Sequence, residues 1–292
     1  MKNNAIYSRR ELIKKSAILA SIGVLGISWN AFSSTKKRNY KLSICDWSIG
    51  MQNRTEALAY AKKIGLDGVQ ISLGSVENNM HLRQKEIQKQ YRQSAIKNNI
   101  VISSLAIGEL NTVPYKSAPE TEQWVSDSVD VAKTMGCKVI LLAFFSNGDL
   151  RGDEEGIKEV IRRLKKVAPK AEKAGVVLGI ESWLSAEEHL RIINAVGSKN
   201  VRVYYDVANA TEMGYDIIDE IRRLGKEYIC EVHLKENGFL LGHGKVDFVK
   251  VKNVLDEIGY KGWIIMEGAV PDGADLFESY VTNAAYVRSI FT

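Results

Sequence analysis

The feature that most constrains the fold is a regular alternation, from Tyr40 onward, of short apolar or β-branched runs with longer amphipathic stretches. Such an alternation is typical of parallel strands joined by crossover helices. Eight strand-like runs are recognised: KLSICDW, DGVQISL, IVISSLAIG, KVILLAFF, VVLGIES, VRVYYDVAN, ICEVHLKE and WIIMEG. We therefore expect eight consecutive βα units.

Glycines mark the joints between these units. One stands just past the last periodic residue of five helix-like segments, at Gly65, Gly136, Gly175, Gly225 and Gly259. A glycine in this position is a common helix stop. The regular joints predict an α/β fold with a single (β/α)8 TIM barrel over residues 40–292. A doubly wound open sheet is the alternative, but no Gly-rich phosphate loop follows the first strand.

The first 33 residues differ from the rest. The segment Ser8–Lys14 reads SRRELIK and resembles a twin-arginine signal, and an uncharged apolar run follows from Ser16. We therefore predict a twin-arginine-type signal peptide over residues 1–33 and export to the periplasm. An uncleaved segment would instead anchor the protein in the membrane, whereas the cleaved protein would have no stable membrane span. Cleavage leaves 259 residues, a usual length for an eight-unit barrel.

Charge and cysteine content exclude several protein classes. The net charge of +5 falls to +1 without residues 1–33, which carry five basic side chains and one acid. A nearly neutral protein lacks the positive surface of a nucleic-acid binder, so we expect no nucleic-acid partner. Cys45, Cys137 and Cys230 are odd in number and lie in or beside predicted strands. They are best interpreted as buried, unpaired thiols.

Four consecutive predicted strands end in residues that commonly bind metals: Glu181, Asp206, His233 and Glu267. Each alone has a structural explanation, as a rim salt bridge, a helix cap or a core histidine. In a barrel, however, the carboxyl ends of all strands meet at one mouth. Three carboxylates gathered there need a cation. Oxygen-rich ligation with one nitrogen predicts one divalent metal ion, Mn²⁺, Mg²⁺ or Co²⁺, with Zn²⁺ as a further option.

The order Glu, Asp, His, Glu at these strand ends, together with GLDGVQI and GHGKVDF, resembles the xylose isomerase-like barrels, which include the ketose 3-epimerases. The resemblance covers about Leu42 to Phe291. It implies a divalent-metal-dependent sugar isomerase or epimerase that transfers a proton next to a carbonyl through a metal-bound enediolate. It also implies that Glu181 and Glu267 are the catalytic base and acid, and that Asp206 and His233 only hold the metal. The implied partner is a small-molecule carbohydrate, with a homo-oligomer left open.

Further residues are predicted to contact the sugar. Polar candidates that would bind hydroxyl groups are Glu187, Asn209, Lys235 and His243. Aromatic candidates for an apolar floor are Trp47, Trp183, Phe144 and Phe145. Each has a structural alternative: a first-turn helix acid for Glu187, loop surface for Lys235 and His243, and barrel packing for the aromatic residues. His81 and His189 are interpreted as surface or helix residues.

Three departures from the family pattern bear on the substrate. Asn209 stands where several ketose epimerases have a histidine, Gln70 replaces a common glutamate, and His243 stands for a common arginine. No group of Arg or Lys residues is evident at the mouth for a phosphate. A neutral or oxidised sugar is therefore expected.

Three other functions are alternatives to this one. A lyase or dehydratase would expel a β-leaving group from a keto-sugar or 3-keto-glycoside at the same metal site, and it needs the same base. An apurinic-site endonuclease shares the barrel but needs more histidines than the four in this chain, and a positive surface. A non-catalytic carbohydrate-binding barrel would not require a paired base and acid.

Overall fold

The computed structural model describes residues 40–291. The predicted signal peptide at residues 1–33 lies outside the described residues, so it stays a prediction. Among the described residues, no helix has both the length and the apolar character needed to cross a bilayer.

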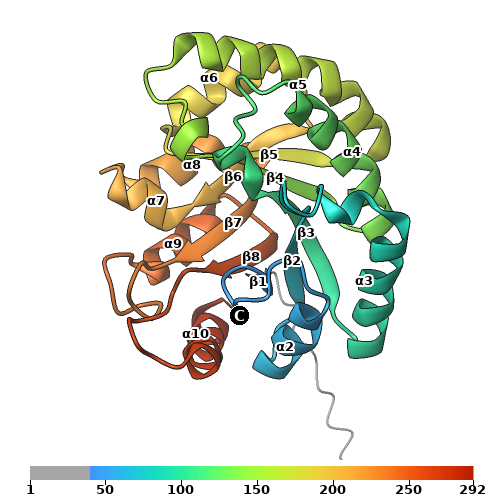
Figure 1. The fold of residues 1–292 in the computed structure, drawn as a ribbon. Coiled ribbons are helices and arrows are strands. Elements are labelled where there is room, and N and C mark those ends of the chain that lie inside the picture. The colour runs from blue at the N-terminus through green and yellow to red at the C-terminus, as the bar shows by residue number, and fades with distance from the viewer. Residues whose placement is uncertain (1–39, 292) are drawn as a thin grey trace, which may run out of the picture. The chain divides into compact units, whose positions relative to one another are not determined.

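The described chain forms a closed barrel of eight parallel strands (Figure 1). Each strand pairs with the next along the chain, and β8 closes the barrel by pairing with β1, with Tyr40 opposite Gly262. The predicted (β/α)8 fold is confirmed. The strands are β1 (Tyr40–Cys45), β2 (Gly68–Ser72), β3 (Val101–Ile107), β4 (Val139–Phe144), β5 (Val177–Ser182), β6 (Val201–Asp206), β7 (Ile229–Lys235) and β8 (Gly262–Glu267).

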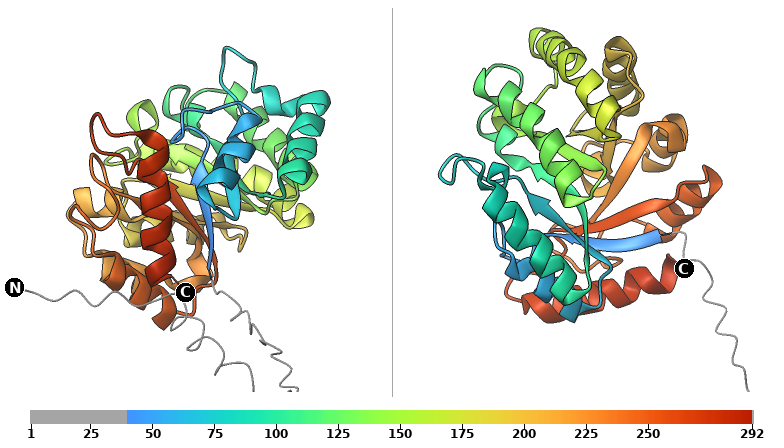
Figure 2. Two further views of the ribbon diagram at one scale, coloured as in Figure 1. Left: turned by 90° about the horizontal axis from the view of Figure 1, so that it is seen from below. Right: turned by 90° about the vertical axis from the view of Figure 1, so that its right-hand side faces the viewer.

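Helices surround the barrel, and α10 packs beside α2 (Figure 2). They are α2 (Glu56–Ile64), α3 (Lys85–Asn98), α4 (Glu120–Met135), α5 (Glu154–Ala174), α6 (Ala186–Val196), α7 (Val207–Glu212), α8 (Ile217–Tyr228), α9 (Phe248–Glu257) and α10 (Leu276–Ile290). In α5, Ile157, Val160, Leu164 and Val167 recur at helical spacing and are buried. Burial of each such side chain contributes roughly 1.5–3 kcal/mol, so the apolar stripe holds the helix on the barrel.

The predicted glycine stops hold at Gly65, Gly136 and Gly175, where the backbone is left-handed and the glycine N–H bonds back to the helix. The predicted stop at Gly225 is a break in α8, because its φ of 60° and ψ of 175° are not helical. One further helical turn follows the break and reaches Tyr228, which the sequence did not predict. The resumed turn is held by a hydrogen bond from the backbone N–H of Ile229 to the carbonyl oxygen of Gly225. Gly225 therefore makes a kink.

The barrel interior contains a buried polar layer. Ser43, Gln70, Ser104, Glu231 and His233 are each at most 1% exposed. Buried polar groups require hydrogen-bond partners, and these side chains find most of theirs across the barrel. The three cysteines are free, with Cys45 and Cys137 buried and Cys230 partly buried, which confirms their interpretation as unpaired thiols.

Candidate active site

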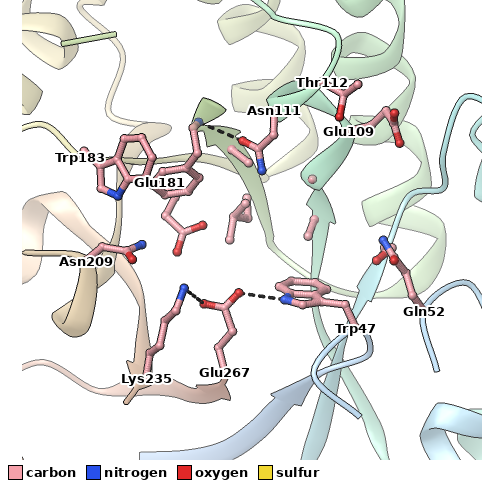
Figure 3. Close-up of a pocket in the computed structure, with 16 residues that line it drawn as sticks. Trp47, Gln52, Glu109, Asn111, Thr112, Glu181, Trp183, Asn209, Lys235 and Glu267 are labelled. Atoms are coloured by element: carbon pink, nitrogen blue, oxygen red, sulfur yellow. Dashed lines mark hydrogen bonds and ion pairs between the residues drawn. The ribbon is translucent and has the colours of Figure 1, made fainter. Parts of the chain in front are cut away.

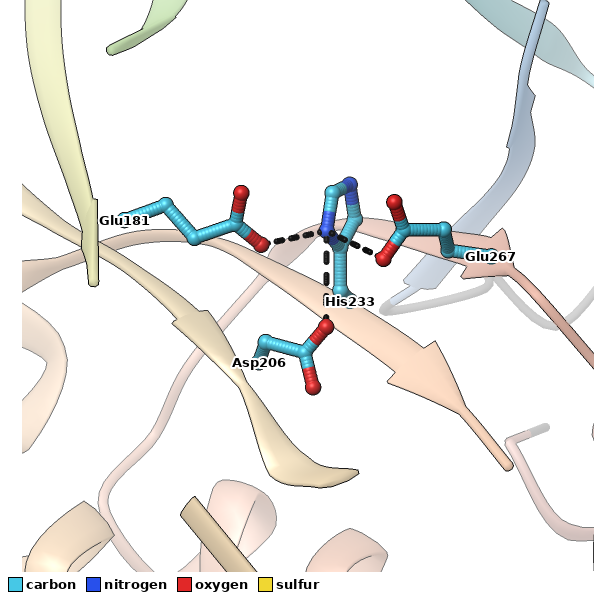
Figure 4. A group of neighbouring side chains, drawn as sticks. All are labelled: Glu181, Asp206, His233 and Glu267. Atoms are coloured by element: carbon cyan, nitrogen blue, oxygen red, sulfur yellow. Dashed lines mark hydrogen bonds and ion pairs between the residues drawn. The ribbon is translucent and has the colours of Figure 1, made fainter. Parts of the chain in front are cut away.

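The four strand-end residues converge at the mouth of the barrel. Glu181 comes from β5, Asp206 from β6, His233 from β7 and Glu267 from β8. Their side chains point toward one another, and one possible ligand atom from each lies within 4.8 Å of the other three (Figure 4). Because successive parallel strands end side by side, residues at the ends of four consecutive strands become neighbours around one point at the mouth.

The imidazole of His233 lies among the three carboxylates. Its Nδ1 is 2.7 Å from Oε1 of Glu181, 3.5 Å from Oε2 of Glu267 and 3.8 Å from Oδ2 of Asp206. Glu181 and Glu267 lie on opposite sides of the ring (Figure 4). All four side chains are shielded from water, with Glu267 the most exposed at 15%.

Asp206 divides its two oxygens between different tasks. Its Oδ1 accepts hydrogen bonds of 2.8 Å from the backbone N–H groups of Ala208 and Asn209 and so caps α7. Its Oδ2 faces the centre, is buried and has no hydrogen-bond partner. An unpartnered buried carboxylate oxygen beside two further carboxylates is what a bound cation would satisfy. The residues present therefore fit a divalent metal ion.

Electrostatics support this fit. Burial raises the pKa of Asp206, and the charges of Glu267 and Glu181 add to that effect. Burial lowers the pKa of His233, but the three carboxylates outweigh it and raise that pKa to about 9. Without a bound cation, Asp206 and His233 retain their protons to higher pH, because protonation reduces the repulsion among the buried carboxylates.

A cavity of about 400 Å³ is lined by two members of this cluster, Glu181 and Glu267 (Figure 3). Four of the predicted substrate-binding residues line it: Trp47, Trp183, Asn209 and Lys235. Two of them hold Glu267, since Trp47 Nε1 donates to its Oε1 at 2.8 Å and Lys235 Nζ lies 3.2 Å from its Oε2. Phe145 also lines the cavity and packs edge-on against Trp183.

The other predicted contacts lie elsewhere. Glu187 is 81% exposed and pairs with Arg223 of α8 at 2.8 Å, because the first turn of α6 faces that helix. His243 is exposed in the loop between β7 and α9 and does not line the cavity. Phe144 is buried against Tyr115. His189 is a buried helix residue whose Nε2 lies 2.9 Å from Oγ of Ser182.

Sequence reasoning missed one wall of the cavity. It is formed by polar residues on loops after β1 and β3 and at the end of β2, namely Gln52, Ser72, Glu109, Asn111 and Thr112. No periodicity or motif marks them. The only available signal was their position at or just after the carboxyl end of a predicted strand, where barrel loops form binding sites.

The fold and this site define the molecule as a (β/α)8 barrel with a buried carboxylate–histidine cluster suited to a divalent cation at its carboxyl-terminal mouth. The sequence model of the family described as xylose isomerase-like TIM barrel matches residues 58–289. The chain belongs to this family.

Relatives in the family carry the names of carbohydrate enzymes. The chain is 27% identical over 142 residues to D-psicose 3-epimerase of Enterocloster bolteae, a match that covers 46% of each chain. It is 38% identical over 74 residues to inosose dehydratase of Klebsiella pneumoniae, or 25% of this chain and 24% of that one. The chain thus spans less than half the length of each of these relatives.

Solved structures show the same fold at low identity. A crystal structure of D-psicose 3-epimerase in the presence of D-fructose has a TM-score of 0.74 at 18% identity, covering 86% of this chain and 99% of that one. The apo form of 3-keto-D-glucoside 4-epimerase from E. coli has a TM-score of 0.71 at 16% identity, with the same coverage. At these identities the likeness concerns the fold.

Proposed function

We propose that this protein is a divalent-metal-dependent sugar isomerase or epimerase that moves a proton next to a carbonyl group. The observation that carries the proposal is the cluster of Glu181, Asp206, His233 and Glu267, in which a buried oxygen of Asp206 lacks a partner. The names of the relatives fit a carbohydrate substrate. Mn²⁺, Mg²⁺ or Co²⁺ suits the oxygen-rich donor set, and Zn²⁺ is compatible with it.

Each residue has a distinct task in this proposal. Asp206 and His233 hold the ion, which when bound would polarise a substrate carbonyl and make the neighbouring C–H more acidic. Glu181 and Glu267 lie on opposite sides of the centre, so one carboxylate removes the proton and the other returns one to the opposite face. Trp47 and Lys235 orient Glu267, while Asn209 and Lys235 offer donors to sugar hydroxyls.

The test combines metal analysis with isotope exchange. Purified protein is analysed for bound metals, then incubated in D2O with a panel of keto-sugars, and deuterium at the carbon next to the carbonyl is measured. We expect one equivalent of metal and exchange that Glu181→Gln and Glu267→Gln abolish. Glu187→Gln, which alters an exposed glutamate, is the matched control. A metal-loaded protein that binds sugar without exchanging hydrogen would instead be a carbohydrate-binding barrel.

Elimination is the second candidate reaction. It is favoured by the similarity of a quarter of the chain to inosose dehydratase. In this reaction the same carboxylate removes the proton, and a β-substituent of a keto-sugar or 3-keto-glycoside departs. Incubation with a 3-keto-glucoside decides between the two, because elimination releases the aglycone whereas epimerisation leaves it attached.

We also propose that the protein is exported to the periplasm through its SRRELIK segment. Replacement of both Arg9 and Arg10 by lysine keeps the charge and alters the arginine pair. We expect the variant to accumulate in the cytoplasm and the parent chain in the periplasmic fraction. Equal export of both would overturn the assignment.

A further inference from the structure

The amide of Gln70, on β2, uses every hydrogen bond that a glutamine side chain can make. Its Nε2 donates to Oγ of Ser104 at 3.1 Å and to the hydroxyl of Tyr204 at 2.9 Å. Its Oε1 accepts from the thiol of Cys45 at 3.2 Å and lies 3.0 Å from Nε2 of His233. A glutamine amide has two donor protons and two acceptor lone pairs, so this set is complete.

The orientation of this amide follows from its own hydrogen-bond partners. The thiol of Cys45 is a donor and faces Oε1 of Gln70, whereas the hydroxyl groups of Ser104 and Tyr204 each have lone pairs that accept from Nε2. A reversed amide would exchange the bond from the thiol for a contact with sulfur, which is a weak acceptor. The Nε2 of Gln70 therefore faces the hydroxyl groups, and its oxygen faces His233.

The oxygen of Gln70 determines which ring nitrogen of His233 carries the proton. An imidazole whose Nε2 meets an acceptor carries its proton there, and in the neutral ring Nδ1 is then an unprotonated lone pair. That lone pair faces three carboxylates, the nearest oxygen being 2.7 Å away. Acceptors that face one another at this distance need a positive charge between them. Tyr204 also packs against the ring, with centroids 4.6 Å apart, which limits its rotation.

We propose that Gln70 is a positioning residue that sets the affinity of the centre for its metal ion, by holding His233 in the tautomer whose Nδ1 lone pair points at the three carboxylates. The proposal rests on the proposed metal-dependent function. Gln70 is fully buried behind the imidazole and does not line the cavity, so its effect passes through His233. Groups behind a metal-binding histidine commonly change metal affinity about 10- to 100-fold.

The test measures metal affinity in two variants of Gln70. Gln70→Met keeps the length of the side chain but removes the acceptor, whereas Gln70→Glu keeps an acceptor for Nε2–H of His233. Binding of Mn²⁺ to chelator-treated full-length protein is followed by calorimetry. We expect the Kd to rise about 10- to 100-fold in Gln70→Met, and to return to within about threefold of the parent value in Gln70→Glu.

A matched control separates positioning from general loss of packing. Ser43 is fully buried in the same interior layer and shares a 2.8 Å hydrogen bond with Ser103. Among the described residues its side chain has no hydrogen bond to Gln70 or His233. Ser43→Ala should leave the Kd unchanged. Thermal unfolding of all variants identifies any that fail to fold. An equal rise of the Kd in Ser43→Ala and Gln70→Met would overturn the proposal.

A second readout reports the hydrogen bond behind His233. The chain has four histidines, so ring ¹⁵N–¹H spectra of the Zn²⁺-loaded protein are simple, and His233→Gln assigns the signal of interest. An ion at Nδ1 would leave the ring proton on Nε2 in every variant, so the chemical shift of that proton reports its acceptor. We expect a downfield Nε2–H signal in the parent protein and in Gln70→Glu, and an upfield shift of this signal in Gln70→Met. An unchanged shift in Gln70→Met, or an unchanged Kd, would overturn the role of Gln70.

The two proposals fail separately. A parent protein that binds Mn²⁺ but exchanges no sugar hydrogen contradicts the proposed reaction and leaves the role of Gln70 intact. A Gln70→Met variant with parental affinity contradicts the role of Gln70 and leaves the proposed reaction intact. A parent protein that binds no divalent ion overturns both.

Discussion

The indole Nε1 of Trp47 lies 2.8 Å from Oε1 of Glu267 and joins the loop after the first strand to the end of the last. The other oxygen of Glu267 faces His233 and Lys235. Trp47 thus orients a carboxylate that we assign to proton transfer. It binds Oε1 and leaves Oε2 free to face the other three members of the cluster.

Replacement of this indole tests its role. We expect Trp47→Phe to lower kcat about tenfold or more, because a hydrogen bond to a charged group contributes roughly 1.5–3 kcal/mol. Trp183→Phe is the matched control, since Trp183 lines the same cavity but its indole has no hydrogen bond among the described residues. Steady-state kinetics of both variants at full metal occupancy provide the comparison. Equal losses would assign both residues to packing alone.

Metal removal should destabilise the barrel. A ligand present at about 100 times its Kd stabilises the folded state by about 2.7 kcal/mol. Chelation is therefore expected to lower the thermal midpoint, and re-addition of Mn²⁺ to restore it. If the protein contains metal and chelation leaves the midpoint of thermal unfolding unchanged, the metal is not bound at the proposed site.

Asp206→Asn separates the two tasks of Asp206. Burial raises its pKa, so its ionised form is penalised in the folded state at pH values above the unfolded pKa. Asparagine keeps an oxygen to cap α7 and removes that charge. We expect the metal-free variant to be more stable than the metal-free parent at pH 8, by about 1 kcal/mol, and to bind metal poorly.

Asp216→Asn is the control for this comparison. Asp216 caps α8 through bonds to the backbone N–H groups of Ile218 and Asp219, away from the centre. Denaturant unfolding of the metal-free proteins at pH 8 should show no gain for Asp216→Asn. A gain of equal size there would mean that the buried charge at Asp206 is not the cause.

The two predicted polar contacts Glu187 and Asn209 should behave differently. Glu187 is exposed and pairs with Arg223, so we expect Glu187→Ala to keep kcat/KM within about twofold of the parent value. Asn209 is buried and lines the cavity, so Asn209→Ala should raise KM about three- to tenfold through the loss of one hydrogen bond. A larger effect of Glu187→Ala would place the substrate over α6.

Acid should destabilise the protein partly through His189. Burial lowers its pKa to about 4, and its ring bonds suit the neutral form, with Nδ1–H donating to the carbonyl oxygen of Ser185. The unfolded chain takes up this proton near pH 6.5 and the folded chain only near 4, so stability falls as the pH drops between these values. Between pH 7.5 and 5 the loss is about 2 kcal/mol.

Denaturant unfolding of the parent and His189→Gln at both pH values measures this term. The variant loses the hydrogen bonds at pH 7.5, but its stability should fall less on acidification. A parallel fall in both proteins would show that His189 does not contribute to the acid sensitivity.

Local sequence patterns were sufficient to predict the barrel and the four ligand candidates. The alternation of strands and helices is a local property, and a closed parallel barrel places the carboxyl ends of all its strands together. Glu181, Asp206, His233 and Glu267 could therefore be predicted to meet from their positions at strand ends. Local backbone preference also predicted the stops at Gly65, Gly136 and Gly175, but not the resumed turn after Gly225.

Only the tertiary structure decided which way individual side chains point and what lies behind them. Glu187 faces α8, whereas Asn209, on the short helix α7 next to Asp206, faces the cavity. Gln70 contacts His233 across 163 residues of chain, and Gln52 and Glu109 reach the cavity from loops without a repeating pattern. Such contacts depend on the paths of loops and on side-chain rotamers, which are set by packing against elements distant in the sequence. The local spacing of apolar residues carries no information about them.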